Sequence, residues 1–463
     1  MGSVEHSALP ARDDEADAAS YGELETEQVR QDLTAIAVRQ VSRPRPGRRQ
    51  EGGSRAASGG LADGPPRYNA NNVSHIQENP SSEAESAVRQ DRRERRFAQR
   101  QALWAITSLD RVRKCGRTTN GNVGDGLAAI VVNGSVAHWA GFCTCGSIWA
   151  CPVCSAKIRA TRADEIARAV AAHMTRDGGT AWMVTLTARH KRHHDLAPLF
   201  DAVANGWRKL MSGRAWAGDP KRGVLGERDR LGVRGNIRSM EVTYGTRNGW
   251  HPHLHVVLLL SKETGEELAY AIHRWDKTWR AWMKKQGFEP SKEHGVKWSK
   301  VTTPEEAGEY IAKTQEGKHI GNEIARGDFK KGKFSTLAPF ELLEYFRQTG
   351  DMAVLPVWQE YEQGTHRRRA ITWSRGLRAE LLGDEPELSD DEVAAEEVGG
   401  ETWAILPAES LRAIRRVPGL QTRLLDVAEN GGFIELVNLL TAYHLTYQTG
   451  PDAPKTEVSP AAS

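Results

Sequence analysis

The pattern of apolar and polar positions divides the chain into a polar beginning, a long folded stretch and a polar break near its end. Aromatic residues are almost absent from the first hundred positions, and we expect residues 1–99 to be a disordered N-terminal extension. Apolar residues recur from Leu103 onwards. An acidic run over 383–400 indicates a linker, and it precedes a predicted small helical tail over 401–450 and a disordered end over 451–463.

Strand and helix patterns alternate in the central block. Residues 182–187 are apolar and β-branched, which predicts a strand. Apolar residues at helical spacing follow over 199–210 and again over 268–282. Between these helices lie two predicted strands, 237–244 and 251–260, joined by a short turn. Short connections favour antiparallel neighbours, so we predict an α+β fold in which helices pack on an antiparallel sheet.

Three histidines at alternate positions are the sharpest chemical feature. His251, His253 and His255 project from the same face of a strand, because successive side chains alternate between the two faces. Pro252 cannot donate to a strand ladder, so His253 and His255 are the better placed pair. A single strand histidine is usually a core residue, whereas three in register predict a site for a divalent ion.

Glu241 on the preceding strand is the natural third ligand. Two imidazoles, one carboxylate and open positions suit Mg²⁺ or Mn²⁺ bound to phosphate oxygens. A two-residue turn at Asn248-Gly249 would pair Glu241 with Val256 and place it on the face away from the histidines. The ligand role therefore requires a bulge or a longer loop, and a solvated strand charge is the alternative.

A short helix predicted after Thr303 carries a second set of reactive groups. Pro304 suits its first turn, and Glu306, Tyr310 and Lys313 then share one face. Tyr310 is a candidate nucleophile for a phosphodiester, Lys313 can hold phosphate or stabilise the phenolate, and Glu306 can activate water. Thr303 and Glu306 also fit a capping box, which would occupy that carboxylate at the helix start.

The five cysteines predict a metal site rather than disulfides. Cys145, Cys151 and Cys154 supply three thiolates, and either Cys143 or Cys115 can complete a tetrahedral Zn²⁺ shell. Four cysteines within twelve residues are typical of a structural metal site in a reducing compartment. Buried free thiols are the alternative.

Net charge does not identify a partner, because 63 Lys and Arg against 60 Asp and Glu leave only +3. Local basic clusters suggest contacts with DNA phosphates, and solvated surface is the alternative for each of them. The candidates are Lys157, Arg159, Arg162, His190, Arg367, Arg368, Arg369, Arg375 and Arg378.

Membrane and secreted classes do not fit the sequence. No stretch of 18 apolar residues is present, and the N-terminus is acidic and polar where a signal peptide needs a basic start and an apolar run. We therefore expect a cytoplasmic protein with no membrane partner.

Several motifs together resemble a known superfamily. Thr-Leu-Thr at 185–187, His-Pro-His-Leu-His at 251–255 and Tyr-Ile-Ala-Lys at 310–313 are similar to the three motifs of the HUH endonucleases. The segments 145–154 and 373–378 resemble, more narrowly, the rolling-circle replication initiators of actinobacterial plasmids. The likeness spans about residues 104 to 380.

The resemblance implies a fold and a reaction. The fold is a five-stranded antiparallel sheet with the histidine strand at its centre. In the reaction a tyrosine attacks one phosphate of the double-strand origin, stays linked to the 5′ end and frees a 3′-hydroxyl primer. Glu306 matches a glutamate that directs the final water in one branch of the family. The implied partners are origin DNA, single-stranded DNA, a host helicase and a DNA polymerase, while a homodimer on DNA remains open.

The resemblance also sets the expected domains. We expect a zinc- and DNA-binding segment over 100–175, the HUH endonuclease domain over 176–335 and a basic C-terminal part over 336–382. A relaxase or transposase would use the same chemistry on other DNA sites. A zinc-dependent DNA-binding regulator without catalysis would explain the cysteines but not the histidine row.

Overall fold

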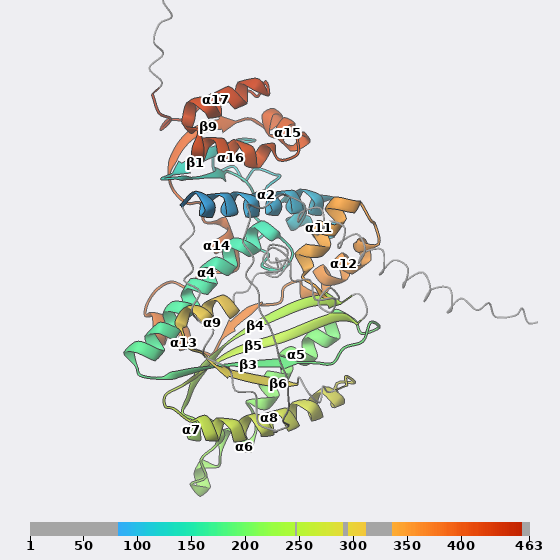
Figure 1. Cartoon of the computed structure of the whole chain (residues 1–463), viewed down its shortest axis with the longest axis vertical. Coiled ribbons are helices and arrows are strands. Elements are labelled where there is room, and N and C mark those ends of the chain that lie inside the picture. Colours follow the sequence, from blue (N-terminus) through green and yellow to red (C-terminus); the bar gives the residue numbers. More distant parts are fainter. Residues whose placement is uncertain (1–81, 246–247, 290–294, 312–335, 456–463) are drawn as a thin grey trace, which may run out of the picture.

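The computed structural model describes residues 82–245, 248–289, 295–311 and 336–455 of the chain. It contains two sheets, and every strand pair in these ranges is antiparallel. Helices pack on both sheets, and the long helix α2 (Ser82–Ile106) runs between the two units (Figure 1). The predicted α+β class is confirmed.

The larger sheet has the order β6-β3-β5-β4-β7, and a sixth strand, β8, also pairs with β4. Its strands are β3 (Thr180–Thr187), β4 (Val233–Gly245), β5 (Gly249–Leu260), β6 (Val296–Lys300), β7 (Thr336–Leu337) and β8 (Ile371–Trp373). The resemblance implies five strands. The sixth is accommodated because β4 is long: β7 pairs with Tyr244 and Gly245, and β8 pairs further along the same edge with residues 237–239. β5, which carries the histidines, lies between β3 and β4.

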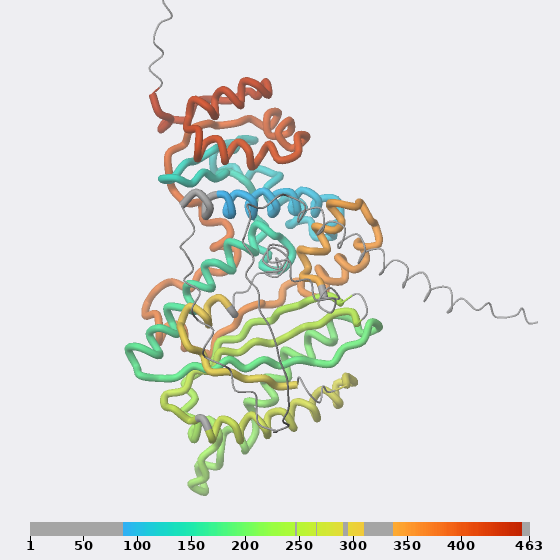
Figure 2. Tube along the Cα trace, in the orientation of Figure 1, coloured from blue at the N-terminus to red at the C-terminus, as the bar shows by residue number. Residues whose placement is uncertain are grey.

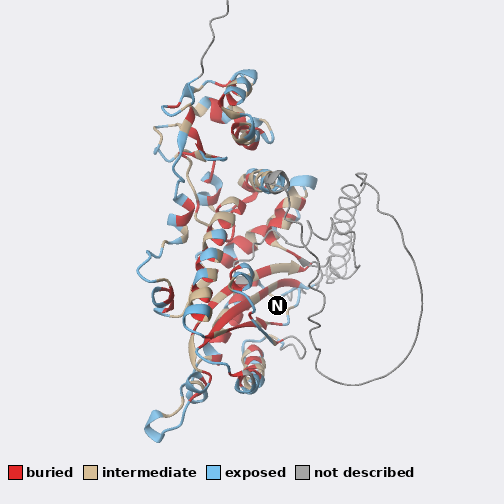
Figure 3. Ribbon diagram, turned by 60° about the vertical axis from the view of Figure 1, so that its left-hand side comes forward, coloured by how far each residue is buried: buried red, intermediate tan, exposed pale blue. Residues whose placement is uncertain are grey.

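Two cores form on the two faces of this sheet. Leu254 and Val256 of β5 belong to the larger core, and Val257 and Leu259 belong to the second core together with Ile166 of α4. Figure 3 shows the buried residues concentrated along the sheet and the helices that cover it. The helices of the larger core include α5 (Leu196–Leu210), α8 (Gly265–Lys285), α11 (Pro339–Thr349) and α12 (Val354–Thr365). The second face is covered by α4 (Pro152–Ala171), α9 (Pro304–Ile311) and α13 (Leu377–Leu382).

The N-terminal helix corrects the predicted disorder over 82–99. The composition of α2 is strongly polar, but Arg93 forms ion pairs with Asp426 and, at 2.6 Å, with Glu429. Gln99 is buried and donates to the carbonyl of Phe340 at 3.2 Å. Contacts with distant parts of the chain therefore hold a helix that its own sequence does not suggest. Residues 1–81 lie outside the described ranges.

The second sheet joins the beginning and the end of the described chain. Its order is β10-β9-β1-β2, and Ile130 of β1 pairs with Ala404 of β9. Figure 2 follows the trace from the early strands to the neighbouring late ones. The strands are β1 (Ala128–Asn133), β2 (Val136–Ala140), β9 (Glu401–Leu406) and β10 (Gln448–Thr449), with helices α15 (Ala408–Arg416), α16 (Leu420–Asn430) and α17 (Gly432–Ala442). The expected helical tail is thus one part of a mixed unit, because the apolar strand β1 requires a partner from the C-terminal region.

The acidic segment predicted as a linker is folded onto α4. Its helix α14 (Asp390–Ala395) begins with a capping box between Ser389 and Glu392, and it buries Val393 and Ala394. The remaining short elements are α3 (Asp110–Lys114), the π-helix η1 (Ala172–Arg176), α6 (Arg214–Ala217), the 3₁₀ helix η2 (Pro220–Arg222) and α7 (Glu227–Arg230). None of the helices that the structure describes has the length and apolar character that a bilayer crossing needs.

Candidate functional site

The register of the β4–β5 hairpin places Glu241 beside the histidines. Strand β4 ends at Gly245 and β5 begins at Gly249, so three residues connect them and Glu241 pairs directly with His253. The glycine at 249 has a φ of +73°, which lets the chain turn back into β5. This is the longer loop that the ligand role of Glu241 requires, and it puts the carboxylate on the histidine face.

His255 and Glu241 bring two candidate metal-ligand atoms together. The Nε2 atom of His255 lies 2.9 Å from Oε2 of Glu241, and its Nδ1 atom lies 3.2 Å from Oγ1 of Thr185. Neighbouring ligands of an octahedral Mg²⁺ at about 2.1 Å are separated by about 3.0 Å. The pair therefore fits two adjacent positions around such an ion, and Thr185 can accept from Nδ1 and hold the imidazole in the tautomer that leaves Nε2 free to bind.

The histidine row extends beyond the three predicted members. Ring centroids of His253 and His255 are 6.0 Å apart, those of His251 and His253 are 3.7 Å apart, and His190 stacks on His251 at 4.1 Å. Burial, followed by the charges of His253 and His190, lowers the pKa of His251 to about 2. Burial also lowers the pKa of His190. Neutral imidazoles are the form that binds metal, and His190 joins the row from the loop after β3.

Tyr310 lies in α9, on the histidine side of the sheet. Helix α9 packs against α4 and contacts β5. Its close approach depends on Gly308, where a Cβ would lie 2.5 Å from the carbonyl oxygen of Ala163. The carboxylate of Glu306 accepts from the backbone N–H and the hydroxyl of Thr302 at 2.9 and 2.7 Å. These hydrogen bonds lower the pKa of Glu306 and occupy its carboxylate at the helix start, with Thr302 as the donor in place of the Thr303 of the predicted capping box. Lys313 lies outside the described residues.

The cysteines form a compact cluster, and its fourth member is Cys115. The sulfur of Cys115 lies 3.7 Å from that of Cys151 and 3.5 Å from that of Cys154, which is 3.7 Å from that of Cys145. Four thiolates bound to Zn²⁺ at about 2.3 Å have sulfurs about 3.8 Å apart, so these residues fit a tetrahedral zinc shell. Cys143 instead lies against the carbonyl of Thr119 at 3.4 Å. Across the described residues, this buried set is the one group of three or more candidate ligands that lie within 4.8 Å of one another.

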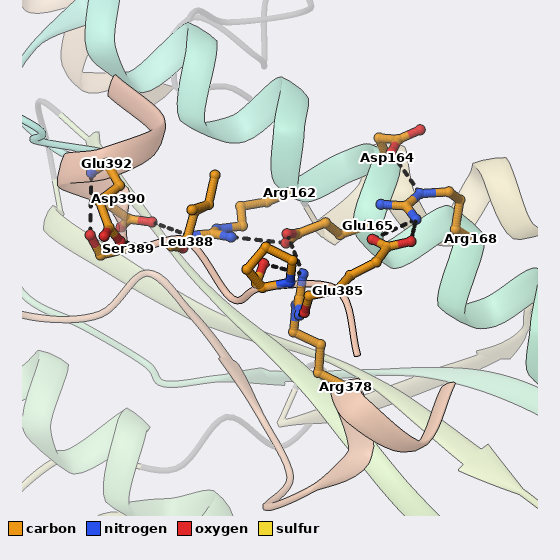
Figure 4. A network of polar contacts seen from close by, with 11 residues as sticks. Arg162, Asp164, Glu165, Arg168, Arg378, Glu385, Leu388, Ser389, Asp390 and Glu392 are labelled. Carbon is orange, nitrogen blue, oxygen red and sulfur yellow. Dashed lines mark hydrogen bonds and ion pairs between the residues drawn. The ribbon is translucent and has the colours of Figure 1, made fainter. Parts of the chain in front are cut away.

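Three of the expected phosphate contacts are internal. Arg159, Arg162 and Arg378 are only 2%, 8% and 7% exposed. Arg162 and Arg378 bind opposite oxygens of the buried Glu165 at 2.9 and 3.0 Å, and Arg162 also pairs with Asp390 of α14 (Figure 4). The guanidinium groups of Arg162 and Arg378 therefore hold the acidic segment on α4 in place of contacting DNA.

The other basic candidates divide into two groups. Lys157 donates to the carbonyl of Glu396, and Arg368 pairs with Asp201 and lies 4.8 Å above the ring of Phe200. Both are therefore engaged within the protein. The remaining arginines are exposed and accessible to phosphates, namely Arg367, Arg369 and Arg375.

Comparison with known proteins identifies the family. The replication protein family Rep_1 matches residues 135–405. The chain is similar to "Protein rep" of Streptomyces lividans, with 38% identity over 320 residues that cover 57% of this chain and 70% of the relative. It is also similar to "Neomycin resistance protein" of Streptomyces cyanogenus, with 39% identity over 140 residues that cover 27% of this chain and 32% of the relative. No solved structure matches.

The matched range contains both hairpin strands, α9 and every cysteine of the cluster except Cys115. It therefore includes the residues on which the resemblance is based. The chain belongs to the Rep_1 family of replication proteins, in agreement with its resemblance to the replication initiators of actinobacterial plasmids.

Proposed function

We propose that this protein initiates plasmid replication by binding the double-strand origin and nicking one strand through a tyrosine transesterification. Membership of the replication protein family supports the role in replication. The observation that carries the nicking chemistry is the meeting of His255 and Glu241 on the sheet face that α9 covers. A metal-ligand pair beneath a helix that carries Tyr310 is the arrangement that metal-assisted phosphodiester cleavage needs.

The reaction follows from the residues on this face. Glu241 and His255, which already meet, would hold Mg²⁺ or Mn²⁺ together with His253 once its ring turns toward them, and the bound ion would withdraw charge from the non-bridging oxygens of the scissile phosphate. The Tyr310 oxygen attacks phosphorus, the bond to the 3′ oxygen breaks, and the phenol proton ends on that oxygen. The products are a 5′-phosphotyrosine and a free 3′-hydroxyl, and a DNA polymerase can extend the latter.

Glu306 and Lys313 have supporting roles in this proposal. Lys313 would stabilise the developing phenolate of Tyr310. Glu306 precedes Tyr310 by about one helical turn and would activate the water that ends the cycle. Its two hydrogen bonds from Thr302 both end on Oε2, so the other oxygen, Oε1, would take the proton from that water.

The cysteine cluster would hold a structural zinc. Two cysteines of the cluster lie at the start of helix α4. Cys151 directly precedes its first residue, Pro152, and Cys154 lies in its first turn. Further along, the same helix covers the histidine face of the sheet. A bound Zn²⁺ would therefore fix the start of the helix against which α9 packs.

The exposed arginines and the reaction products suggest the macromolecular partners. Arg367, Arg369 and Arg375 would contact the phosphates of origin DNA and of the displaced single strand. Extension from the free 3′-hydroxyl requires a host polymerase, and unwinding ahead of it requires a host helicase.

A substitution of the nucleophile tests this function. Purified protein is incubated with Mg²⁺ or Mn²⁺ and a supercoiled plasmid that carries the candidate replicon. We expect nicked circles with protein bound covalently to the 5′ end. Tyr310→Phe should abolish nicking and spare DNA binding, while Tyr270→Phe, at an exposed tyrosine on α8, should leave both unchanged.

The outcomes of this experiment separate a nicking enzyme from a DNA-binding regulator without catalysis. Nicking by the wild-type protein and by Tyr270→Phe, together with its loss in Tyr310→Phe, supports the proposal. Undiminished nicking by Tyr310→Phe would remove this tyrosine as the nucleophile. A gel shift without any cleavage by the wild-type protein supports the non-catalytic regulator.

A further inference from the structure

A small hairpin projects from the end of the molecule opposite the C-terminal unit. It lies between α5 and β4, includes α6 and η2, and extends beyond α7 and α8 (Figure 1). Figure 3 shows its tip as an exposed protrusion. None of the residues proposed for nicking belongs to it.

The hairpin has a defined structure of its own, with hydrogen bonds and close packing between its two arms. Asp219 and Val224 form an antiparallel bridge, with N···O distances of 2.8 and 3.1 Å. Its two arms approach so closely that a Cβ on Gly218 would overlap the carbonyl oxygen of Val224, and one on Gly226 would overlap the carbonyl oxygen of Trp216. Two glycines are thus needed for this packing.

The base of the hairpin is anchored on α8. The ring of Trp216 lies 6.3 Å from that of Trp275. Glu227, at the end of the hairpin, is buried, accepts from Nε1 of Trp275 at 2.9 Å and pairs with Arg274. These contacts fix the direction in which the tip points.

The tip combines exposed apolar side chains with cations. Val224 and Leu225 are 55% and 62% exposed, and Lys221 and Arg222 beside them are also exposed. Five basic residues and three acidic ones lie between 213 and 230, and the acidic Glu227 is already paired with Arg274. The basic residues are all exposed: Arg214, Lys221, Arg222, Arg228 and Arg230. An apolar pair flanked by cations is complementary to a polyanion that also offers apolar surface, which is the chemistry of duplex DNA.

We propose that this hairpin is a second DNA contact, in which Lys221 and Arg222 bind phosphates while Val224 and Leu225 wedge against the bases of the duplex that flanks the nick site. The inference rests on the proposed function, because the nicked DNA is the duplex that the hairpin contacts. The chain leaves the hairpin into β4, whose first residue pairs with Leu260. About seven residues of β5 separate Leu260 from His253, or about 24 Å. The hairpin is anchored on α8, which covers the other face of the sheet, so the wedge acts at least about seven base pairs from the nick, at about 3.4 Å per pair, and opens the flanking duplex.

The apolar pair is tested with two DNA substrates. Val224→Ser combined with Leu225→Ser should lower the rate of nicking on supercoiled plasmid by about tenfold. Cleavage of a single-stranded oligonucleotide that carries the same site should be unchanged, because no duplex has to open. Ile434→Ser, at an exposed apolar position on α17, is the matched control and should change neither rate. Equal rates for the double variant and wild type on the plasmid would overturn the wedge.

The basic pair is tested by binding alone, which keeps this inference separate from nicking. Lys221→Gln with Arg222→Gln should reduce the slope of log affinity against log salt concentration by about two on a random duplex of about 30 base pairs. Lys284→Gln with Lys285→Gln, two exposed lysines at the end of α8, should leave the slope unchanged. This result would support the hairpin contact even if wild-type protein cleaved no DNA. An unchanged slope in the hairpin variant would overturn the proposal. The exposed tip would then be a contact site for a protein.

Discussion

Cys115 and Cys143 differ in what surrounds them in space, although Cys143 is much nearer to the other cysteines in the chain. Cys115 meets the sulfurs of Cys151 and Cys154, whereas the sulfur of Cys143 lies against a backbone carbonyl. Spacing alone leaves both residues open as the fourth ligand. The choice depends on where the end of α3 places Cys115 in space, and no local sequence pattern specifies that position.

Exchange of these two cysteines for serine should therefore have opposite results. Cys115→Ser should lose the bound zinc and lower the melting temperature, because three thiolates cannot close the tetrahedral shell. Cys143→Ser should keep one zinc per chain. Metal released by a thiol-modifying reagent, measured with a colorimetric chelator, provides the count. Equal zinc content in both variants would contradict the assignment of Cys115.

A carboxyl group on α11 predicts a pH dependence of stability. Burial raises the pKa of Glu341 to about 7, and its carboxylate accepts from the N–H of Ala338 at 2.6 Å. Between the unfolded value of 4.5 and about 7 the folded state binds more protons than the unfolded state. The free energy of unfolding contributed by this group is therefore greatest below pH 4.5 and falls as the pH rises through 7.

Glu341→Gln should remove that contribution. Relative to the variant, wild-type protein should lose about 2 kcal/mol between about pH 5 and pH 8, less than the full shift would give because the carboxyl keeps partial solvent contact. Urea unfolding at the two pH values measures the difference. Parallel pH profiles for the two proteins would show that Glu341 titrates normally.

Among the elements, the helices and strands with clear apolar periodicity lie where the sequence predicts them. Those that depend on distant partners do not. Strands β3, β4 and β5 and the start of α9 follow their predicted ranges closely. Helix α2 and strand β9 have no matching prediction, because ion pairs from Arg93 and pairing with β1 stabilise them. The face of Glu241 depends on one residue of loop length, since a change of one in register reverses the side of every side chain.

Arg162 of α4 and Arg378 of α13 also show that contacts with distant residues decide a role that the sequence leaves open. A sequence shows arginines but not the acidic segment that folds back on them, so it predicts DNA contacts for Arg162 and Arg378 where the structure has ion pairs. Arg375 lies three residues before Arg378 and is exposed. The two positions 375 and 378 therefore provide a matched pair for separating structural from DNA-binding roles.

Replacement of each arginine should affect a different property. Arg378→Ala leaves Glu165 with one buried partner and frees the carbonyls of Glu385 and Pro386, and it should lower the free energy of unfolding by about 3 kcal/mol. Arg375→Ala should change stability by less than about 0.5 kcal/mol and reduce the salt slope of DNA binding by about one. Urea unfolding and fluorescence anisotropy of labelled duplex measure the two effects. A reversed pattern would restore Arg378 as a phosphate contact.

At the scale of the whole molecule, the second sheet depends on both ends of the described chain. Ala128, Ile130 and Val132 of β1 are buried in one core with Leu406 of β9 and the helices that follow it. A two-stranded β1–β2 hairpin has little independent stability. The small C-terminal unit is thus inseparable from residues that lie before the large sheet in the sequence.

A chain shortened to end at Gly400 tests this dependence. It should expose the apolar face of β1, bind more of the dye ANS and aggregate at lower temperature than the full chain. A chain that ends at Lys455 retains every described element and should behave as the full chain does. Equal dye binding by the two shortened chains would mean that β1 and β2 remain covered without β9.

The pairing of β1 with β9 also has a consequence for synthesis on the ribosome. Asn133, the last residue of β1, and Glu401, the first of β9, are 268 positions apart in the sequence. At about 5–20 residues per second, β1 waits roughly 13 to 54 s for its partner. During that interval, in which the strands of the central sheet are synthesised, a nascent chain carries an uncovered apolar strand, so this strand is where a chaperone has the longest opportunity to bind.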